Sequence, residues 1–225
     1  VAGEEQLMEL LDTVKKLEII AIDTETDSLD VIAATLVGVS ISWKKGEGYY
    51  VPAPLALALK PVLEDEKIKK VGHNLKFDWH ILQNAGITLG GIYFDTMIAA
   101  YLIDPGRRQY SLESLVFQHF GVQMQKIEEL IGKKGTTPQL SMAHVDPEKV
   151  AQYSADDARY TYALYEKLAP EVEKKGVKKV FFDIEMPLVA ILGQMERWGI
   201  ALDINRLEKL DTHVSSEIKK HEQKI

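Results

Sequence analysis

The order of the predicted elements indicates an α/β protein, in which helices cover a β-sheet. An apolar strand candidate spans residues 18–25, and two more strand candidates span residues 35–43 and 48–53. Helical patterns alternate with them or follow them, and the longest spans residues 146–168. Strands that come first with helices interleaved afterwards are typical of a layered α/β domain. The chain has 225 residues, a length that fits one domain with part of another or two small domains. Hydrophobic residues make up 46% of it, which is ample for a folded core.

The first half of the chain contains the strands. Residues 4–17 precede them and are predicted to form a helix, because their apolar side chains recur at helical spacing. The glycines of KKGEG, residues 44–48, suit a hairpin between the second and third strand candidates. Residues 61–70 predict a short helix and residues 71–74 the end of another strand.

The second half of the chain is predicted to be mainly helical. Asp146 is the expected N-cap of the longest helix and Pro147 its first residue, while Gly86 is expected to end an earlier helix. The predicted helices cover residues 76–86, 111–121 and 146–168, a loop covers 131–140, and 93–103 fits either a strand or a helix.

Composition excludes several classes of protein. The chain has no Cys, so disulfide frameworks, thiolate metal sites and Cys nucleophiles are ruled out. It has no apolar stretch long enough to span a membrane and no signal peptide, so we expect a cytoplasmic protein. The net charge of −7 argues against nucleic-acid binding, unless some of the acids hold metal ions.

Three acids, Asp23, Glu25 and Asp27, follow the apolar start of the first strand. Residues two apart in a strand project to the same face, so Asp23 and Glu25 form a pair about 7 Å apart. A hard divalent cation would relieve their repulsion. A solvated strand end has the same pattern, so the pair by itself leaves both interpretations open.

Two helical segments carry a second polar pair each. Asn74 and Asp78 are four residues apart in NLKFD, and Tyr153 and Asp157 are four apart in YSADD, so each pair shares a helix face. Asp156, next to Asp157 in the chain, is expected to lie on a different face of the helix. A phenol beside a carboxylate can orient water, and a carboxylate can bind metal. Taken singly, the first segment is better explained as an N-capped amphipathic helix and the second as a core tyrosine beside a surface acid.

The three motifs DTETDSL, NLKFD and YSADD, in this order, resemble those of the 3′→5′ proofreading exonucleases. The words GHNLKFD, FDTMIAAYL, IGKKG, YSADDA and IEMPLVAILGQMERWGIALD are most similar to the exonuclease domain of bacterial family A DNA polymerases. The resemblance runs from about residue 18 to about residue 210. It implies a ribonuclease H-like mixed sheet flanked by helices, with a helical C-terminal extension.

The resemblance also assigns roles to single residues. It implies two divalent ions, Mg²⁺ or Mn²⁺/Zn²⁺, and a tyrosine that positions the attacking water. The implied ligands are Asp23, Glu25, Asp78 and Asp157, the tyrosine is Tyr153, and Leu29, Asn74 and Phe77 would contact the terminal nucleotide. His73 and Ile127 depart from the family pattern, which often has Gln and an aromatic residue there, and Asp27 has no assigned role. Apart from the resemblance, basic side chains could help to bind single-stranded DNA, although solvated loops are the simpler explanation for several of them. These residues are Lys44, Lys45, Arg107, Arg108, Lys133 and Lys134.

The function implied is metal-dependent removal of the 3′-terminal nucleotide of DNA, with the single-stranded 3′ end as partner. Residues 1–172 would form the exonuclease domain, and residues 173–225 the first helices of a polymerase domain in the same parent chain. We therefore expect a monomeric fragment that does not polymerise DNA. Two alternatives stay open: a catalytically silent DNA-end-binding module, and an RNA-trimming exonuclease of the ribonuclease D type.

Overall fold

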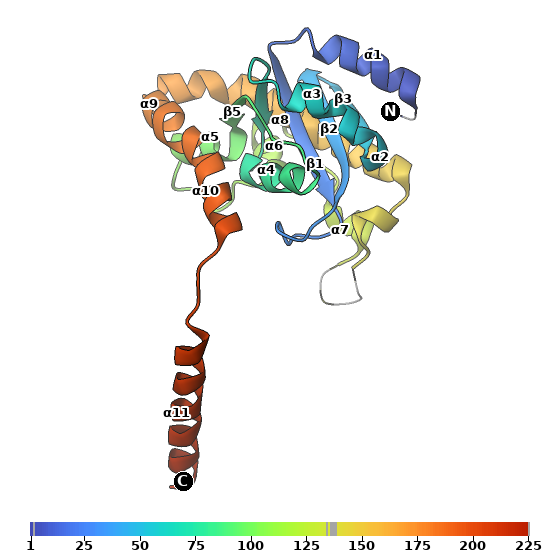
Figure 1. The fold of residues 1–225 in the computed structure, drawn as a ribbon. Coiled ribbons are helices and arrows are strands. Elements are labelled where there is room, and N and C mark those ends of the chain that lie inside the picture. The colour runs from blue at the N-terminus through green and yellow to red at the C-terminus, as the bar shows by residue number, and fades with distance from the viewer. Residues whose placement is uncertain (2, 134, 136–138, 225) are drawn as a thin grey trace. The chain divides into compact units, whose positions relative to one another are not determined.

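The computed structural model describes residues 1, 3–133, 135 and 139–224 (Figure 1). They fall into two compact units, residues 1–193 and residues 194–225. None of the helices in the described part of the chain is long and apolar enough to cross a membrane.

The first unit is built on a mixed five-stranded sheet in the order β3-β2-β1-β4-β5. Strand β1 is antiparallel to β2, which is antiparallel to β3, whereas β1, β4 and β5 run parallel. The carboxyl ends of the parallel strands therefore meet at one edge of the sheet, where α/β proteins place their ligands. The strands are β1 (Ile19–Thr26), β2 (Leu36–Lys44), β3 (Glu47–Pro52), β4 (Lys69–Gly72) and β5 (Ile92–Asp95).

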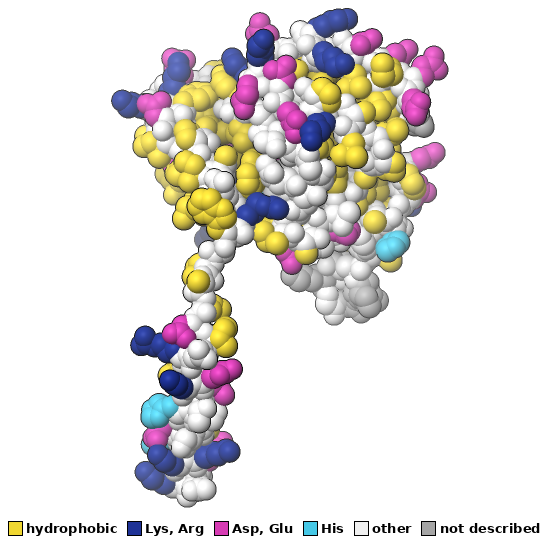
Figure 2. Space-filling view, in the orientation of Figure 1, with side chains coloured by type: hydrophobic (Ala, Val, Ile, Leu, Met, Phe, Trp, Pro, Cys, Tyr) yellow, Lys and Arg dark blue, Asp and Glu magenta, His cyan; other side chains and the backbone are white. Residues whose placement is uncertain are grey.

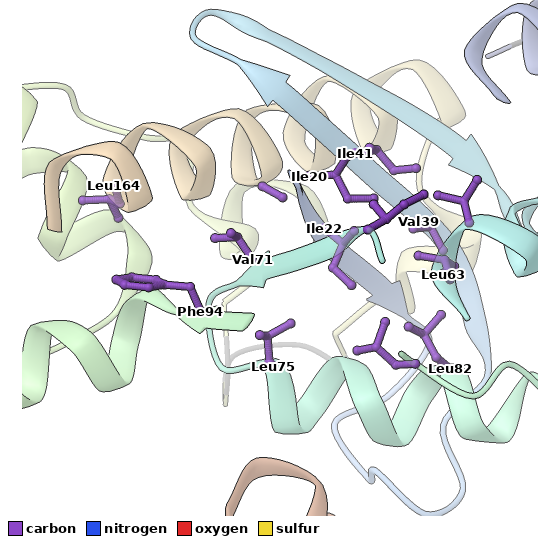
Figure 3. Close-up of a cluster of buried hydrophobic side chains, with 14 of the residues drawn as sticks. Ile20, Ile22, Val39, Ile41, Leu63, Val71, Leu75, Leu82, Phe94 and Leu164 are labelled. Atoms are coloured by element: carbon purple, nitrogen blue, oxygen red, sulfur yellow. The ribbon is translucent and has the colours of Figure 1, made fainter. Parts of the chain in front are cut away.

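Helices pack on both sides of this sheet, as expected for the predicted α/β class. In the core, Leu164 of α8 contacts the apolar cluster from one side, and Leu75 and Leu82 of α4 lie on the other (Figure 3). The helices are α1 (Glu4–Val14), α2 (Ala53–Ala56), α3 (Lys60–Leu63), α4 (Leu75–Asn84), α5 (Thr96–Ile103), α6 (Leu112–Phe120), α7 (Ile127–Ile131), α8 (Pro147–Lys174), α9 (Lys178–Val180) and α10 (Met186–Trp198), with short turns η1 (Leu57–Leu59), η2 (Met142–His144) and η3 (Phe181–Glu185).

The helix predicted over residues 61–70 is correct only for residues 61–63. Helix α3 ends at Leu63, and a turn then leads into β4, which begins at Lys69. Lys70 is fully buried and lies between β1 and β5, where its ammonium group donates to the carbonyl of Asp65. Pairing with two strands distant in sequence thus overrides the local helical pattern.

In two other segments the structure decides bounds that the sequence left open or placed too early. The ambiguous residues 93–103 divide at Asp95, which ends β5 and caps α5 by accepting hydrogen bonds from the amides of Met97 and Ile98. The long helix begins at Pro147 behind the Asp146 cap as predicted, but continues six residues beyond 168, to Lys174. Its length allows one helix to pack against β1, β2, β3 and β4.

The second unit contains the end of α10 and helix α11 (Ile204–Glu222), which Asp203 caps by accepting from the amide of Arg206. Hydrophobic side chains lie exposed among charged ones along α11 (Figure 2). They recur at helical spacing and are Ile204, Leu207, Leu210, Val214 and Ile218. The C-terminal segment is therefore helical, as predicted, and presents an apolar face.

Candidate active site

Three carboxylates gather at the carboxyl end of β1. One oxygen from each of Asp23, Glu25 and Asp157 lies within 4.8 Å of the other two. Asp23 and Glu25 project from the same strand, as their spacing predicted, and Asp157 comes from the middle of α8, which packs across β1. A β-bulge between Glu25 and Thr26 shifts the pairing of β1 with β2 here, and such bulges re-aim side chains near active sites.

The Glu25 side chain is only 6% exposed. Burial, together with the charge of Asp78, raises its pKa to about 7, and the Ser154 hydroxyl opposes the shift. Its Oε1 atom is buried and accepts no hydrogen bond from the described residues. A buried carboxylate oxygen without a partner is costly, so this atom requires either a proton or a cation.

The other two carboxylates of the cluster, those of Asp23 and Asp157, also have raised pKa values. Burial raises the pKa of Asp23 well above its ordinary value, and the charges of Asp78, Asp157 and Glu25 raise it further. Burial likewise raises the pKa of Asp157. Groups that destabilise one another's charge in this way are typical of functional sites.

Tyr153 lies one helical turn before Asp157 on α8 and is 9% exposed. Its phenol lowers the pKa of the Asp157 carboxylate, as a hydrogen-bond donor beside an acid does. Burial, followed by the charge of Asp157, raises the pKa of Tyr153 itself above the usual range. The phenol is therefore protonated near neutral pH and can act as a hydrogen-bond donor but not as a base.

Asp78 lies beside this cluster but outside the group of three. Its Oδ1 accepts from the backbone amide of Thr24 at 3.0 Å and from the Thr24 hydroxyl at 2.7 Å. Burial raises the pKa of Asp78 to about 7, and the two bonds from Thr24 oppose that shift. Asp78 is 3% exposed, and Thr24 fixes the carboxylate against β1 while its charge reaches Asp23.

The turn that leads from β4 into α4 is held by Asp95 and Thr96. The Asp95 carboxylate accepts from the amides of Asn74 and Leu75, and the Thr96 hydroxyl donates to the carbonyl of Gly72. Asn74 has a φ of 70°, the one positive φ of a non-glycine residue in the described chain. Asp95 offsets this backbone strain, and it fixes the first turn of α4, which carries Asp78.

The predicted nucleotide-contacting residues are all at least partly accessible. Leu29 is 84% exposed in the loop that follows β1. Asn74 and Phe77 are half-buried at the start of α4. Ile127, at a position where an aromatic residue was expected, packs against the apolar cluster that contains Tyr153.

Most of the predicted basic residues lie at the surface. Lys44 pairs with Glu47 at 2.8 Å, and both side chains are about half exposed. Lys45, Arg108 and Lys133 are exposed, Arg107 is half-buried, and Lys134 lies outside the described residues. Asp156, expected to point away from the site, forms an ion pair with Arg159 at 3.0 Å.

Four residues near the site were missed by sequence reasoning: Thr24, Asp95, Glu113 and Ser154. Thr24 stands between the two acids of DTE, so strand alternation indicates that it faces the other side of the sheet. Asp95 ends a short strand and precedes a helix, which is the signal of an N-cap. Glu113 lies in the first turn of α6, and its charge raises the pKa values of Asp157 and Tyr153.

The donor set of this site fits a hard divalent cation. Carboxylate oxygens are the ligands that Mg²⁺ and Mn²⁺ prefer. A cation would supply the missing partner of Glu25 Oε1 and remove the repulsion that raises the pKa values of Asp23 and Asp157.

Comparison with known proteins agrees with this geometry. A family model described as 3′-5′ exonuclease matches residues 1–173. The chain belongs to this exonuclease family. Among curated relatives of the exonuclease domain, DNA polymerase I of Pseudomonas aeruginosa is 37% identical over 214 residues, 88% of this chain and 23% of the relative. DNA polymerase I of Borreliella burgdorferi is 35% identical over 208 residues, 88% of this chain and 22% of the relative.

The chain thus matches less than a quarter of the length of these relatives. The resemblance seen in the sequence is confirmed. Among solved structures, the POL domain of Pol1 from M. smegmatis, in complex with DNA primer-template and dNTP, has a TM-score of 0.80 at 22% identity, covering 98% of this chain and 35% of that one. Escherichia coli RNase D has a TM-score of 0.68 at 24% identity, covering 87% and 50%. These likenesses confirm the ribonuclease H-like fold of the exonuclease domain.

Proposed function

We propose that this domain removes the 3′-terminal nucleotide of DNA by hydrolysis, using two divalent cations bound by Asp23, Glu25, Asp78 and Asp157. The observation that carries the proposal is the meeting of three carboxylates within 4.8 Å, one of which has a buried oxygen without a hydrogen-bond partner. The fourth carboxylate, of Asp78, is held beside them by two hydrogen bonds from Thr24.

When bound, Mg²⁺ or Mn²⁺ would supply a hydroxide nucleophile near neutral pH and stabilise the charge on the leaving 3′ oxygen. The residues of the chain would hold the cations and orient the attacking water. In this arrangement Asp157 accepts a hydrogen bond from the Tyr153 phenol, which orients the phenol toward the carboxylates. In this role the phenol oxygen of Tyr153 accepts a hydrogen bond from the attacking water and aligns it with the scissile phosphorus.

The substrate side of the proposal uses Leu29, Asn74 and Phe77. The exposed Leu29 offers an apolar surface to the terminal base, and Phe77 offers an aromatic one, which is how single strands are bound without sequence preference. Asn74 offers an amide for the terminal sugar or base. The DNA partner is therefore a frayed or single-stranded 3′ end, and the role in the cell is the trimming of mispaired primer ends.

The test is incubation with Mg²⁺ or Mn²⁺ and single-stranded DNA that is labelled in its 3′-terminal nucleotide. We expect release of the labelled nucleoside monophosphate by the wild-type chain and none by a double variant, Asp23→Ala with Glu25→Ala. An equal, low release by both proteins would overturn the proposal in favour of a silent module that binds DNA ends. The same assay with an RNA oligonucleotide tests the ribonuclease D alternative, which predicts faster release from RNA.

We further propose that residues 173–225 begin the polymerase domain of a longer parent chain. The apolar side chains that lie exposed along α11 need a partner surface, and the curated relatives are DNA polymerases about four times as long. The proposal includes a monomeric parent protein in the cytoplasm, where it meets DNA. The fragment itself should give no primer extension, which a polymerase assay with primer, template and deoxynucleotides checks.

A further inference from the structure

The loop between β1 and β2, residues 27–35, follows the strand that carries Asp23 and Glu25, and Leu29 lies four residues after Glu25 in the chain. Leu29 is 84% exposed and Ile32 is 52% exposed. Exposed apolar side chains are common on protein surfaces, so exposure alone assigns no role to either residue. The way in which the rest of the molecule holds this loop is more informative.

The base of the loop is closed by Asp27. Its amide donates to the carbonyl of Thr35 at 3.2 Å, and its carboxylate accepts from the amide of Thr35 at 2.7 Å. The Ser141 hydroxyl donates to the Asp27 carbonyl at 3.3 Å. Asp27, for which the sequence assigned no role beyond a turn or surface position, therefore closes the loop that presents Leu29.

The body of the loop is held from the far end of helix α4. The side-chain amide of Asn84 donates to the carbonyls of Val31 and Ala34, both at 3.0 Å. An amide nitrogen carries two hydrogens, and here each is given to a different carbonyl of the loop. Neither Asp nor Ala could make this pair of bonds, because a carboxylate and a methyl group donate no hydrogen bond.

Helix α4 also carries the other predicted contacts of the terminal nucleotide. It begins beside Asn74, and Phe77 and Asp78 lie in its first turn. Asn84 is the last residue of the same helix, so its two hydrogen bonds connect the loop that carries Leu29 to the helix that carries Phe77 and Asp78.

We propose that Asn84 is a positioning residue, which holds Leu29 where it contacts the terminal base. This inference rests on the proposed function, because it assigns to Leu29 a role in binding the 3′ end. It differs from a role in stability alone, since it requires that the effect of Asn84 pass through Leu29 and depend on the base.

The experiment compares two single-stranded oligonucleotides in Mn²⁺, one with a normal 3′-terminal nucleotide and one with an abasic 3′-terminal residue. The proteins are the wild-type chain, Asn84→Ala, Leu29→Ala and the double variant, with Gln83→Ala as a matched control from the adjacent position of α4. Calorimetry measures the Mn²⁺ affinity of each protein, and circular dichroism measures its folding.

We expect Asn84→Ala and Leu29→Ala each to lower kcat/KM for the normal end about fivefold relative to the abasic end, the lower range of stacking effects. The double variant should lose no more than Leu29→Ala alone, because both changes remove one contact. Gln83→Ala should behave as the wild type, and the Mn²⁺ affinity should be unchanged throughout.

Equal losses on both oligonucleotides, or full additivity with Leu29→Ala, would overturn the inference. If Asn84→Ala does not fold, Asn84→Asp takes its place, because it keeps the shape and removes both donors. Failure of both variants to fold would make Asn84 a purely structural residue. If the wild-type chain releases no nucleotide from either end, the proposed function fails and the inference with it, whereas an active wild type with an unselective Asn84 effect refutes the inference alone.

Discussion

Protonation of the carboxylate cluster should control the stability of the metal-free protein. The raised pKa of Glu25 means that the folded state binds this proton more tightly than the unfolded chain does. The stability that this proton contributes is fully present below about pH 4.5, the ordinary value, and is lost as the pH rises through about 7. The raised pKa values of Asp23 and Asp78 act in the same direction.

The size of the effect follows from Glu25 alone. The difference between its ordinary pKa of 4.5 and a value of about 7 corresponds to about 3 kcal/mol of unfolding free energy. The charges of the cluster interact, so contributions from Asp23 and Asp78 do not simply add to this value. Unfolding of the wild-type chain in EDTA should therefore become easier by about 3 kcal/mol or more between pH 4.5 and pH 8.

Urea unfolding followed by circular dichroism at several pH values gives these free energies. Glu25→Gln imitates the protonated side chain, so its profile between pH 4.5 and pH 8 should be flatter by about 3 kcal/mol. Glu166→Gln, which changes an exposed residue of α8, is the matched control and should follow the wild type. Adding Mg²⁺ at pH 8 should restabilise the wild type but not Glu25→Gln. A wild-type stability in EDTA that rises steadily with pH, or a Glu25→Gln profile parallel to it, would refute the reasoning.

Two further substitutions test the site, and a third tests the packing of β3 against α8. Thr24→Val removes the hydroxyl that donates to Asp78, and we expect Mn²⁺ affinity measured by calorimetry to fall about 10- to 100-fold, the range for residues behind metal ligands. Tyr153→Phe removes the phenol, and kcat for nucleotide release should fall roughly a hundredfold with KM unchanged, whereas an unchanged kcat would exclude a role in positioning water. Gly48→Ala places a methyl group against the backbone carbonyl of Ala155 on α8, and thermal unfolding should show a loss of about 1–3 kcal/mol. An equally stable variant would mean that β3 and α8 can separate freely.

Local sequence patterns identified most elements of the fold. Alternation and turn residues located β1, β2 and β3, and the Asp146–Pro147 pair located the start of α8. The pattern failed over residues 61–70, where a buried Lys70 lies in a central strand. A buried lysine at that position depends on pairing with the two neighbouring strands and on the Asp65 carbonyl, which accepts a hydrogen bond from its ammonium group. Local propensity encodes none of these contacts.

For the proposed site, the sequence indicates the residue types and their spacing but not the contacts that hold them. The acids, the tyrosine and their helical or strand spacing are visible in the sequence, because residues that share a face of one element recur at fixed intervals. The supporting hydrogen bonds are not visible, because Thr24 reaches Asp78 across 54 positions and Asn84 reaches Ala34 across 50. Bonds of that span depend on how strands and helices pack, not on neighbours in the chain.

The sequence by itself determined the chemical groups, their order and their family: a strand that ends in paired acids, a helix that begins with NLKFD and a helix that contains YSADD. The tertiary structure alone decided that Asp23, Glu25 and Asp157 lie within 4.8 Å of one another and that a Glu25 oxygen is buried without a partner. The physical reason is that a carboxylate's pKa and its need for a cation depend on burial and on neighbouring charges, which exist only once β1, α4 and α8 have packed together.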